Sequence, residues 1–143
     1  MLYYLPLVLT VVANVFYHIS QKYTSNSINP IFSLFVTYLV ATALSAVILV
    51  FYKHENTTAD NMRELNWSAF TLGLAIVLLE LGFLLVYRVG WDIRVASITS
   101  TITLAIILLP IGRFMFGETV SLVNVIGVGV SVVGIVLMNY SRG

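Results

Sequence analysis

The sequence contains no cysteine and very little charge. Only 9% of its 143 residues are Lys, Arg, Asp or Glu, and only three are proline. Without cysteine there can be no disulfide, no thiol catalysis and no thiolate metal site. So few charged side chains cannot cover the surface of a soluble domain, in which about a quarter of residues are charged. The net charge of +1 also gives no reason to expect a nucleic-acid partner.

Hydrophobic residues make up 59% of the chain and are gathered in five runs almost free of charge. Each run has roughly the 20 residues that a helix needs to cross about 30 Å of hydrocarbon. The runs are continuous, whereas the strands of a membrane barrel would alternate with a period of two. We therefore predict an all-α integral membrane protein whose five transmembrane helices span residues 3–22, 30–52, 67–87, 95–115 and 119–140.

Little of the chain remains outside these spans, and the longest connection runs from Lys53 to Asn66. We expect a single transmembrane domain over residues 1–143 with no separate catalytic head. The sequence contains no metal-ligand spacing, nucleophile elbow or phosphate loop, so we expect no enzyme activity, no cofactor and no metal. Such a chain would be a multi-pass protein of an inner (plasma) membrane, surrounded by lipid.

The distribution of basic residues only weakly favours one orientation of the chain in the membrane. Five spans place the termini on opposite sides, and the Lys/Arg asymmetry between the two sides largely sets which way a chain inserts. The amino-terminal side holds three basic residues and the other side four, namely Lys53, Arg63 and Arg113 against Lys22, Arg88, Arg94 and Arg142. The count leaves both dual and single insertion open.

Glu80 is the only acidic residue inside an apolar run, and it has leucines at positions 78, 79 and 81. Ionisable groups in hydrocarbon are costly and commonly functional. Because desolvation disfavours the charged carboxylate, Glu80 is a candidate for exchanging a proton against a substrate or cation. The alternative is a structural carboxyl that only forms a hydrogen bond to a neighbouring helix.

Other polar residues recur at helical spacing and form stripes on several of the predicted helices. Counted from the helix ends at 1.5 Å per residue, Asn14, Glu80 and Thr101 fall at similar depths in the membrane. We therefore predict a substrate- and proton-binding site in a shared polar interior, made by Glu80, Asn14, Tyr17, His18, Tyr87, Ser100 and Thr101. Hydroxyl groups can instead join helices or bond their own backbone, and His18 can be an interfacial residue.

The last predicted helix carries small residues along one face, at alternating spacings of three and four. Small side chains let helix backbones approach closely in a membrane. We predict a dimer interface on this face, formed by Asn124, Gly127, Ser131 and Gly134. Packing against another helix of the same chain is the alternative.

Several segments resemble the drug/metabolite transporter (DMT) superfamily. The resemblance is strongest in Gly82–Trp91, Arg94–Ile98, Phe116–Thr119 and Val125–Asn139. In that superfamily a Phe-Gly-Glu type of turn precedes a glycine-bearing last helix, and Phe116, Gly117 and Glu118 match that turn. Ala13–Phe16 and Lys22 resemble the first helix of the small multidrug resistance proteins, which have four spans. The fifth span makes this chain similar to one EamA-type repeat standing alone.

The resemblance implies a secondary transporter of a small metabolite or drug-like solute, with Glu80 as the proton- or cation-coupling group. Two-repeat relatives arrange their halves in inverted topology, which implies an antiparallel homodimer for a single repeat. One departure matters, because small multidrug resistance proteins carry their coupling carboxylate in the first helix, where this chain has Asn14. Two alternatives remain, a non-transporting subunit of a heteromeric complex and a flippase of lipid-linked intermediates.

Overall fold

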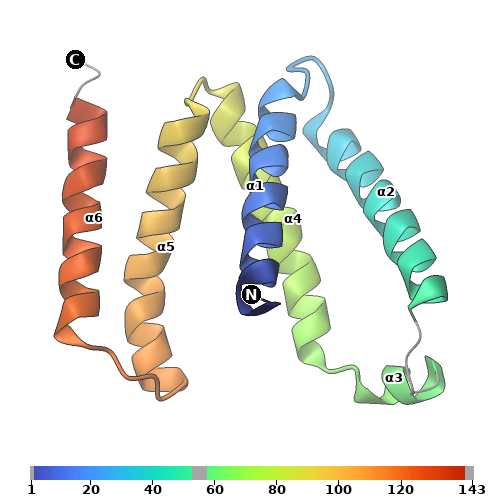
Figure 1. Ribbon diagram of the computed structural model, residues 1–143. Helices are drawn as coiled ribbons and strands as arrows, with labels where there is room; N and C mark the ends of the chain where they lie inside the picture. The colour runs from blue at the N-terminus through green and yellow to red at the C-terminus, as the bar shows by residue number, and fades with distance from the viewer. Residues whose placement is uncertain (1, 53–57, 141–143) are drawn as a thin grey trace. The chain divides into compact units, whose positions relative to one another are not determined.

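The computed structural model describes residues 2–52 and 58–140, and every element in this part of the chain is helical. Lys53 and Arg142, which entered the charge count above, lie outside the described residues. The elements in chain order are η1 (Leu2–Tyr4), α1 (Leu5–Tyr23), α2 (Pro30–Phe51), α3 (Thr58–Glu64), α4 (Trp67–Arg88), α5 (Ile93–Met115) and α6 (Leu122–Tyr140) (Figure 1). The predicted all-α class is confirmed for this part of the chain.

Each of the five predicted spans coincides with one long helix, to within three residues at either end. The short helix α3 was not predicted and lies in the connection between the second and third spans. By length and composition, three helices can cross a membrane, namely α2, α4 and α5. The apolar part of α6, Leu122–Met138, is shorter, and the polar residues of α1 lower its mean hydropathy. The count of five membrane crossings therefore stays a prediction.

The start of α2 shows how local sequence sets a helix boundary. The Asn29 side chain accepts hydrogen bonds from the backbone N–H groups of Ile31 and Phe32, at 2.9 and 3.3 Å. Pro30 follows at the first helical position, where a missing N–H is harmless, as the sequence predicts. A cap of this kind contributes about 1 kcal/mol to helix stability.

The turn between α5 and α6 shifts the start of the last helix from the predicted residue 119 to Leu122. Gly117 adopts a φ of +67°, in the left-handed region, and the Glu118 N–H donates to the Gly112 carbonyl at 3.0 Å. The Ser121 hydroxyl then accepts the Asn124 N–H at 3.2 Å. The chain must therefore reverse and be capped before α6 can begin.

The chain divides into two compact units, and the boundary falls inside α1, between Ile19 and Ser20. One unit contains most of α1 together with α5 and α6, and the other contains α2, α3 and α4. Each is described by itself below. The assignment of residues 1–143 to one domain stays a prediction.

In the unit formed by residues 20–88, α2 packs on α4 at one end only. Leu34 of α2 and Leu84 and Tyr87 of α4 are buried, while residues 39–51 and 67–79 are exposed throughout. Figure 1 shows the two helices close together near the turn after α1 and diverging toward α3. The packed end of this helix pair carries Glu80.

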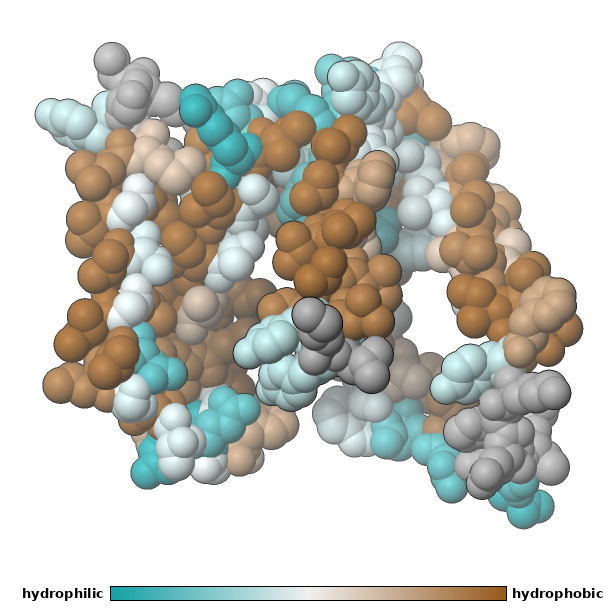
Figure 2. All heavy atoms as spheres, in the orientation of Figure 1, coloured by the Kyte–Doolittle hydropathy of each residue, from teal (hydrophilic) through white to brown (hydrophobic). Residues whose placement is uncertain are grey.

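In the other unit, α5 packs against α6. Val128, Ser131, Ile135 and Met138 are the half-buried residues of α6, and they recur at the three- and four-residue spacing of one helix face. Because α5 is the only described helix that α6 contacts, this face is the one turned toward α5. Along α6 and α2, hydrophobic side chains cover the middle of the helix (Figure 2). Such exposed apolar surface is suited to lipid or to another helix.

Candidate functional site

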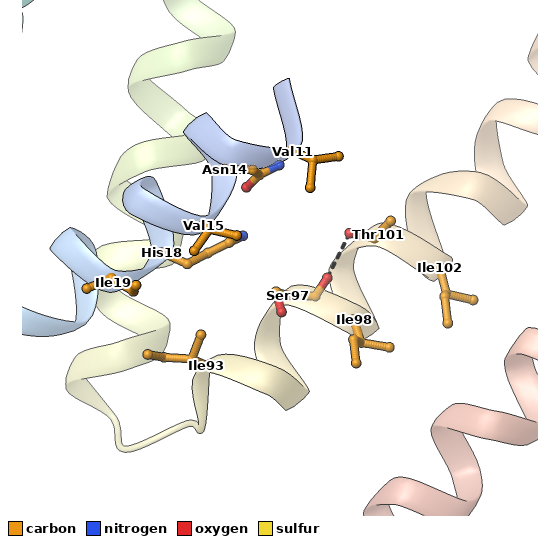
Figure 3. Close-up of a pocket in the computed structure, with 10 residues that line it drawn as sticks. All are labelled: Val11, Asn14, Val15, His18, Ile19, Ile93, Ser97, Ile98, Thr101 and Ile102. Carbon is orange, nitrogen blue, oxygen red and sulfur yellow. Dashed lines mark hydrogen bonds between the residues drawn. The ribbon is translucent and has the colours of Figure 1, made fainter. Parts of the chain in front are cut away.

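An open cavity of about 670 Å³ lies between α1 and α5, within one of the two units. Figure 3 shows its walls, which come from two helices that run in opposite directions. The lining consists of Val11, Asn14, Val15, His18 and Ile19 from α1 and Ile93, Ser97, Ile98, Thr101 and Ile102 from α5. No side chain in this lining carries a permanent charge, because six are aliphatic and four are polar.

The four polar residues of the cavity form two pairs, each with a spacing of four residues along its helix. Asn14 and His18 lie on one face of α1, and Ser97 and Thr101 lie on one face of α5. Residues four apart are neighbours on a helix surface, so each helix presents a short polar row flanked by aliphatic residues. Figure 3 shows the two rows on opposite walls of the cavity.

The hydroxyl groups on α5 are oriented by its own backbone. Thr101 donates to the Ser97 carbonyl at 2.8 Å, and Ser100 donates to the same carbonyl at 3.0 Å. The Ser97 hydroxyl points to the Arg94 carbonyl at 3.4 Å. Since each hydroxyl proton is directed at the backbone, the hydroxyl oxygens of Ser97 and Thr101 are left to accept hydrogen bonds in the cavity.

The cavity contains three of the predicted site residues, Asn14, His18 and Thr101. Two other predicted residues are not part of its lining. Ser100 bonds its own helix, and Tyr17 is half-buried with its ring edge-on to His18 at a centroid distance of 5.2 Å. Ser97 lines the cavity but was not among the predicted site residues, although its spacing of four from Thr101 is the signal that finds it.

Glu80 lies in the other unit, at the packed end of α2 and α4. Its Oε2 atom is buried without a hydrogen-bond partner in the described part of the chain, and so is the hydroxyl of Tyr38 on α2. Tyr38 is within electrostatic range of the Glu80 carboxyl. A carboxyl and a phenol with open hydrogen-bonding capacity therefore face the same helix contact, and Tyr38 was missed as a site residue.

Tyr87 is buried two turns after Glu80 on α4. Its ring stacks with Phe83 at 6.1 Å between centroids, and the Lys22 ammonium nitrogen lies 5.7 Å from the Tyr87 ring centroid. That separation is suited to a cation–π contact. Tyr87 thus joins α4 to the last turn of α1, as a packing residue as well as a predicted site residue.

Arg88, directly after Tyr87, stabilises the turn between α1 and α2. Its guanidinium donates to the carbonyl oxygens of Ser25 and Ile28, at 3.1 and 2.6 Å. These hydrogen bonds to a charged donor hold the start of α2 against the end of α4. This role of Arg88 cannot be predicted from the sequence, because the bonded groups belong to the backbone of a distant segment.

The small-residue face of α6 lies beside the face turned toward α5. A Cβ added at Gly127 or Gly134 would meet nothing within 4 Å, and Asn124 is exposed. Ser131 belongs to both faces, being half-buried and donating to the Gly127 carbonyl at 2.9 Å. The glycines of this face therefore have open space beside them within the described chain.

Among the described residues there is no group of three or more His, Asp or Glu side chains that could hold a metal ion. The long apolar helices and a mixed polar and aliphatic cavity between α1 and α5 define a helical membrane protein with an open cavity. Such cavities between helices are typical of proteins that bind or move small molecules.

A sequence model of the EamA-like transporter family matches residues 1–140, and the chain belongs to this family. The predicted membership of the DMT superfamily is thereby confirmed, and the family is one of membrane transporters rather than enzymes. No curated protein and no solved structure matched the chain in the corresponding searches.

Proposed function

We propose that this protein is a secondary active transporter that binds a small solute in the cavity between α1 and α5. The observation that carries this proposal is the cavity itself, because it contains three of the predicted site residues, two from α1 and one from α5, in a chain of the EamA-like transporter family. Its two polar rows give a solute fixed hydrogen-bonding partners, and its aliphatic walls remove the rest of the solute from water.

Glu80 is the group that couples transport to a proton or a cation. Its support is the buried, unpartnered Oε2 atom at the contact of two apolar helices, described above. A carboxyl in that setting holds a proton at low pH and attracts a cation when it is ionised. Protonation of the Glu80 carboxylate, or binding of a cation to it, would neutralise the unpaired charge at the contact of α2 and α4.

Coupling requires only that proton and solute favour different conformations of the protein, and it is reciprocal. The two sites belong to different units, and α1 contributes to both units because the boundary falls within it. Asn14 and His18 line the cavity, while Lys22 near the end of the same helix lies over Tyr87. A movement of α1 is thus the proposed link between the two sites.

The working unit is an antiparallel homodimer in the inner membrane. The open glycine face of α6 provides space for close approach of a second copy, and the near balance of basic residues is compatible with insertion in both orientations. Transporters often place their substrate site between two inverted repeats. A second copy in inverted orientation would supply the missing repeat.

The coupling proposal is tested with Glu80→Gln in liposomes that contain the purified protein. We expect the variant to lose the dependence of transport on pH, because an amide has no proton to exchange. Circular dichroism and gel filtration would show that the variant still folds. Leu79→Gln is a matched control, as it places the same side chain on an exposed neighbouring position. A Glu80→Gln protein with the wild-type pH profile would refute the coupling role.

A further inference from the structure

The side chains that line the cavity between α1 and α5 restrict the charge and the hydrogen-bonding groups of a ligand that can bind there. We propose that it takes an uncharged solute with an apolar body and at least one N–H or O–H donor, which the hydroxyl oxygens of Ser97 and Thr101 accept. This inference rests on the proposed function, because it names the substrate class of the same cavity.

The first step concerns charge. The cavity lining contains neither an acidic side chain nor Lys or Arg. An ionised solute would therefore lie against aliphatic side chains without a counter-charge and would lose part of its hydration there, which disfavours its binding. His18 is the one titratable residue of the lining. An uncharged solute avoids the cost.

The second step concerns the direction of hydrogen bonding. On the α5 wall, the Thr101 proton is given to the Ser97 carbonyl and the Ser97 proton is directed at the Arg94 carbonyl. Both hydroxyls therefore offer lone pairs to a ligand, and an acceptor on the ligand would have to break a backbone bond to be satisfied. The opposite wall carries the Asn14 amide, which donates and accepts. A ligand therefore needs an N–H or O–H donor to form a hydrogen bond with the Ser97 or Thr101 hydroxyl oxygen.

The third step concerns the body of the ligand. Six of the ten lining residues are valine or isoleucine, and they flank both polar rows. Each apolar carbon placed against them leaves water, which favours binding in proportion to the apolar area buried. A strongly hydrophilic solute such as a sugar would lose more hydrogen bonds to water than two polar rows can replace.

Indole has all three properties, since it is uncharged, apolar and has one N–H donor. Its binding would be measured by titration calorimetry on the protein in lipid nanodiscs, with empty nanodiscs subtracted for partition into lipid. N-methylindole lacks the donor, tryptamine adds an ammonium group and indoleacetate adds a carboxylate. We expect indole to bind at least about threefold more tightly than N-methylindole, the ratio for one neutral hydrogen bond. Tryptamine and indoleacetate should bind more weakly still.

The double variant Ser97→Ala/Thr101→Val removes both acceptor oxygens and nearly preserves side-chain volume. Indole should then bind with an affinity close to that of N-methylindole, and N-methylindole should bind both proteins equally. The exchange variant Ser97→Thr/Thr101→Ser keeps both hydroxyls and should restore the preference for indole. Thr103→Val is the matched control on the same helix, because Thr103 is not part of the cavity lining.

Three results would overturn this inference: tighter binding of tryptamine or indoleacetate than of indole, equal binding of indole and N-methylindole, or a preference unaffected by the double variant. Failure of the proposed transport function is distinguishable, because binding is measured without a gradient. Suppose that transport depends on pH and that the nanodisc titrations show tighter binding of a charged probe. The transporter proposal would then stand, and only the inferred substrate class would be wrong.

Discussion

Two polar residues within apolar helices, Asn14 and Glu80, occupy different surroundings. Asn14 lines an open cavity together with polar groups from a second helix. Glu80 lies at a helix contact, where its Oε2 atom and the Tyr38 hydroxyl are both buried without partners in the described chain. An amide in an open cavity can be satisfied by a solute or by water. A carboxyl at a helix contact needs a proton, a cation or a donor from the facing helix.

Tyr38 carries a hydroxyl donor at the same contact of α2 and α4. Tyr38→Phe deletes a hydroxyl that lies within electrostatic range of Glu80 and is a potential hydrogen-bond donor to its carboxylate. Without that donor the charged carboxylate is less stable, so it holds its proton up to a higher pH. We expect the pH midpoint of transport to rise by about one to two units, since a hydrogen bond to a charged group contributes about 1.5–3 kcal/mol and one pH unit corresponds to about 1.4 kcal/mol.

The midpoint would be measured from initial transport rates in liposomes over a range of pH. Tyr23→Phe serves as the control, because Tyr23 is 85% exposed and lies outside the contact of α2 and α4. An unchanged midpoint in Tyr38→Phe would mean that Glu80 obtains its donor elsewhere.

At the scale of the elements, helix boundaries follow from short sequence signals. Asn29 and Pro30 start α2, and Gly117 permits the reversal between α5 and α6. These signals are local, so they can be recognised in the sequence. The divergence of α2 and α4 toward α3 does not follow from local signals of this kind. It arises because large side chains pack at one end of the pair, while the other ends carry exposed apolar residues.

Gly117→Ala tests the turn before α6. A residue with a side chain in the left-handed region costs about 1–2 kcal/mol, so we expect the free energy of unfolding to fall by that amount. Gly129→Ala is the matched control, because a Cβ at helical Gly129 meets nothing within 4 Å and alanine favours a helix. Unfolding would be followed by circular dichroism in detergent. Equal losses of stability in the two variants would contradict the role of the turn.

At the scale of the whole molecule, the described helices expose most of their large apolar side chains. In a membrane these surfaces contact lipid, and part of them can contact a second copy of the chain. Within the described residues the glycines of α6 leave space beside the helix, and the cavity between α1 and α5 is open. The proposed antiparallel dimer would cover surfaces of this kind.

Orientation is the property that tests the dimer, and the absence of cysteine makes it measurable. Asn26→Cys lies in the turn after α1 and Thr119→Cys in the turn before α6, which five alternating crossings place on opposite sides of the membrane. Intact cells would be labelled with a membrane-impermeant thiol reagent, before and after permeabilisation. We expect roughly half of each site to be labelled from outside, as dual insertion requires.

Complete labelling of one site and none of the other would establish a single orientation. An antiparallel homodimer would then be excluded, and an oppositely oriented partner chain would be the assembly to seek. Labelling of both sites from the same side only would contradict the five crossings themselves.

The class of protein, the positions of the long helices and the family resemblance could all be predicted from the sequence. These depend on hydrophobic runs of membrane length, on caps such as Asn29–Pro30 and on short motifs such as Phe116–Glu118, all of which act over a few neighbouring residues. The sequence also singled out Glu80, since one carboxyl in an apolar run is visible without any structure.

Which polar residues meet depends on how the helices pack, and could not be predicted from the sequence. Asn14, His18, Ser97 and Thr101 come together because α1 and α5 lie across a cavity, although most of the chain separates them in sequence. Tyr38 and Glu80 are brought within electrostatic range because α2 and α4 pack at that end. Arg88 reaches backbone carbonyls about 60 residues away for the same reason. Helical periodicity assigns a residue to a face of its own helix, but which helix that face meets is set by the packing of distant segments.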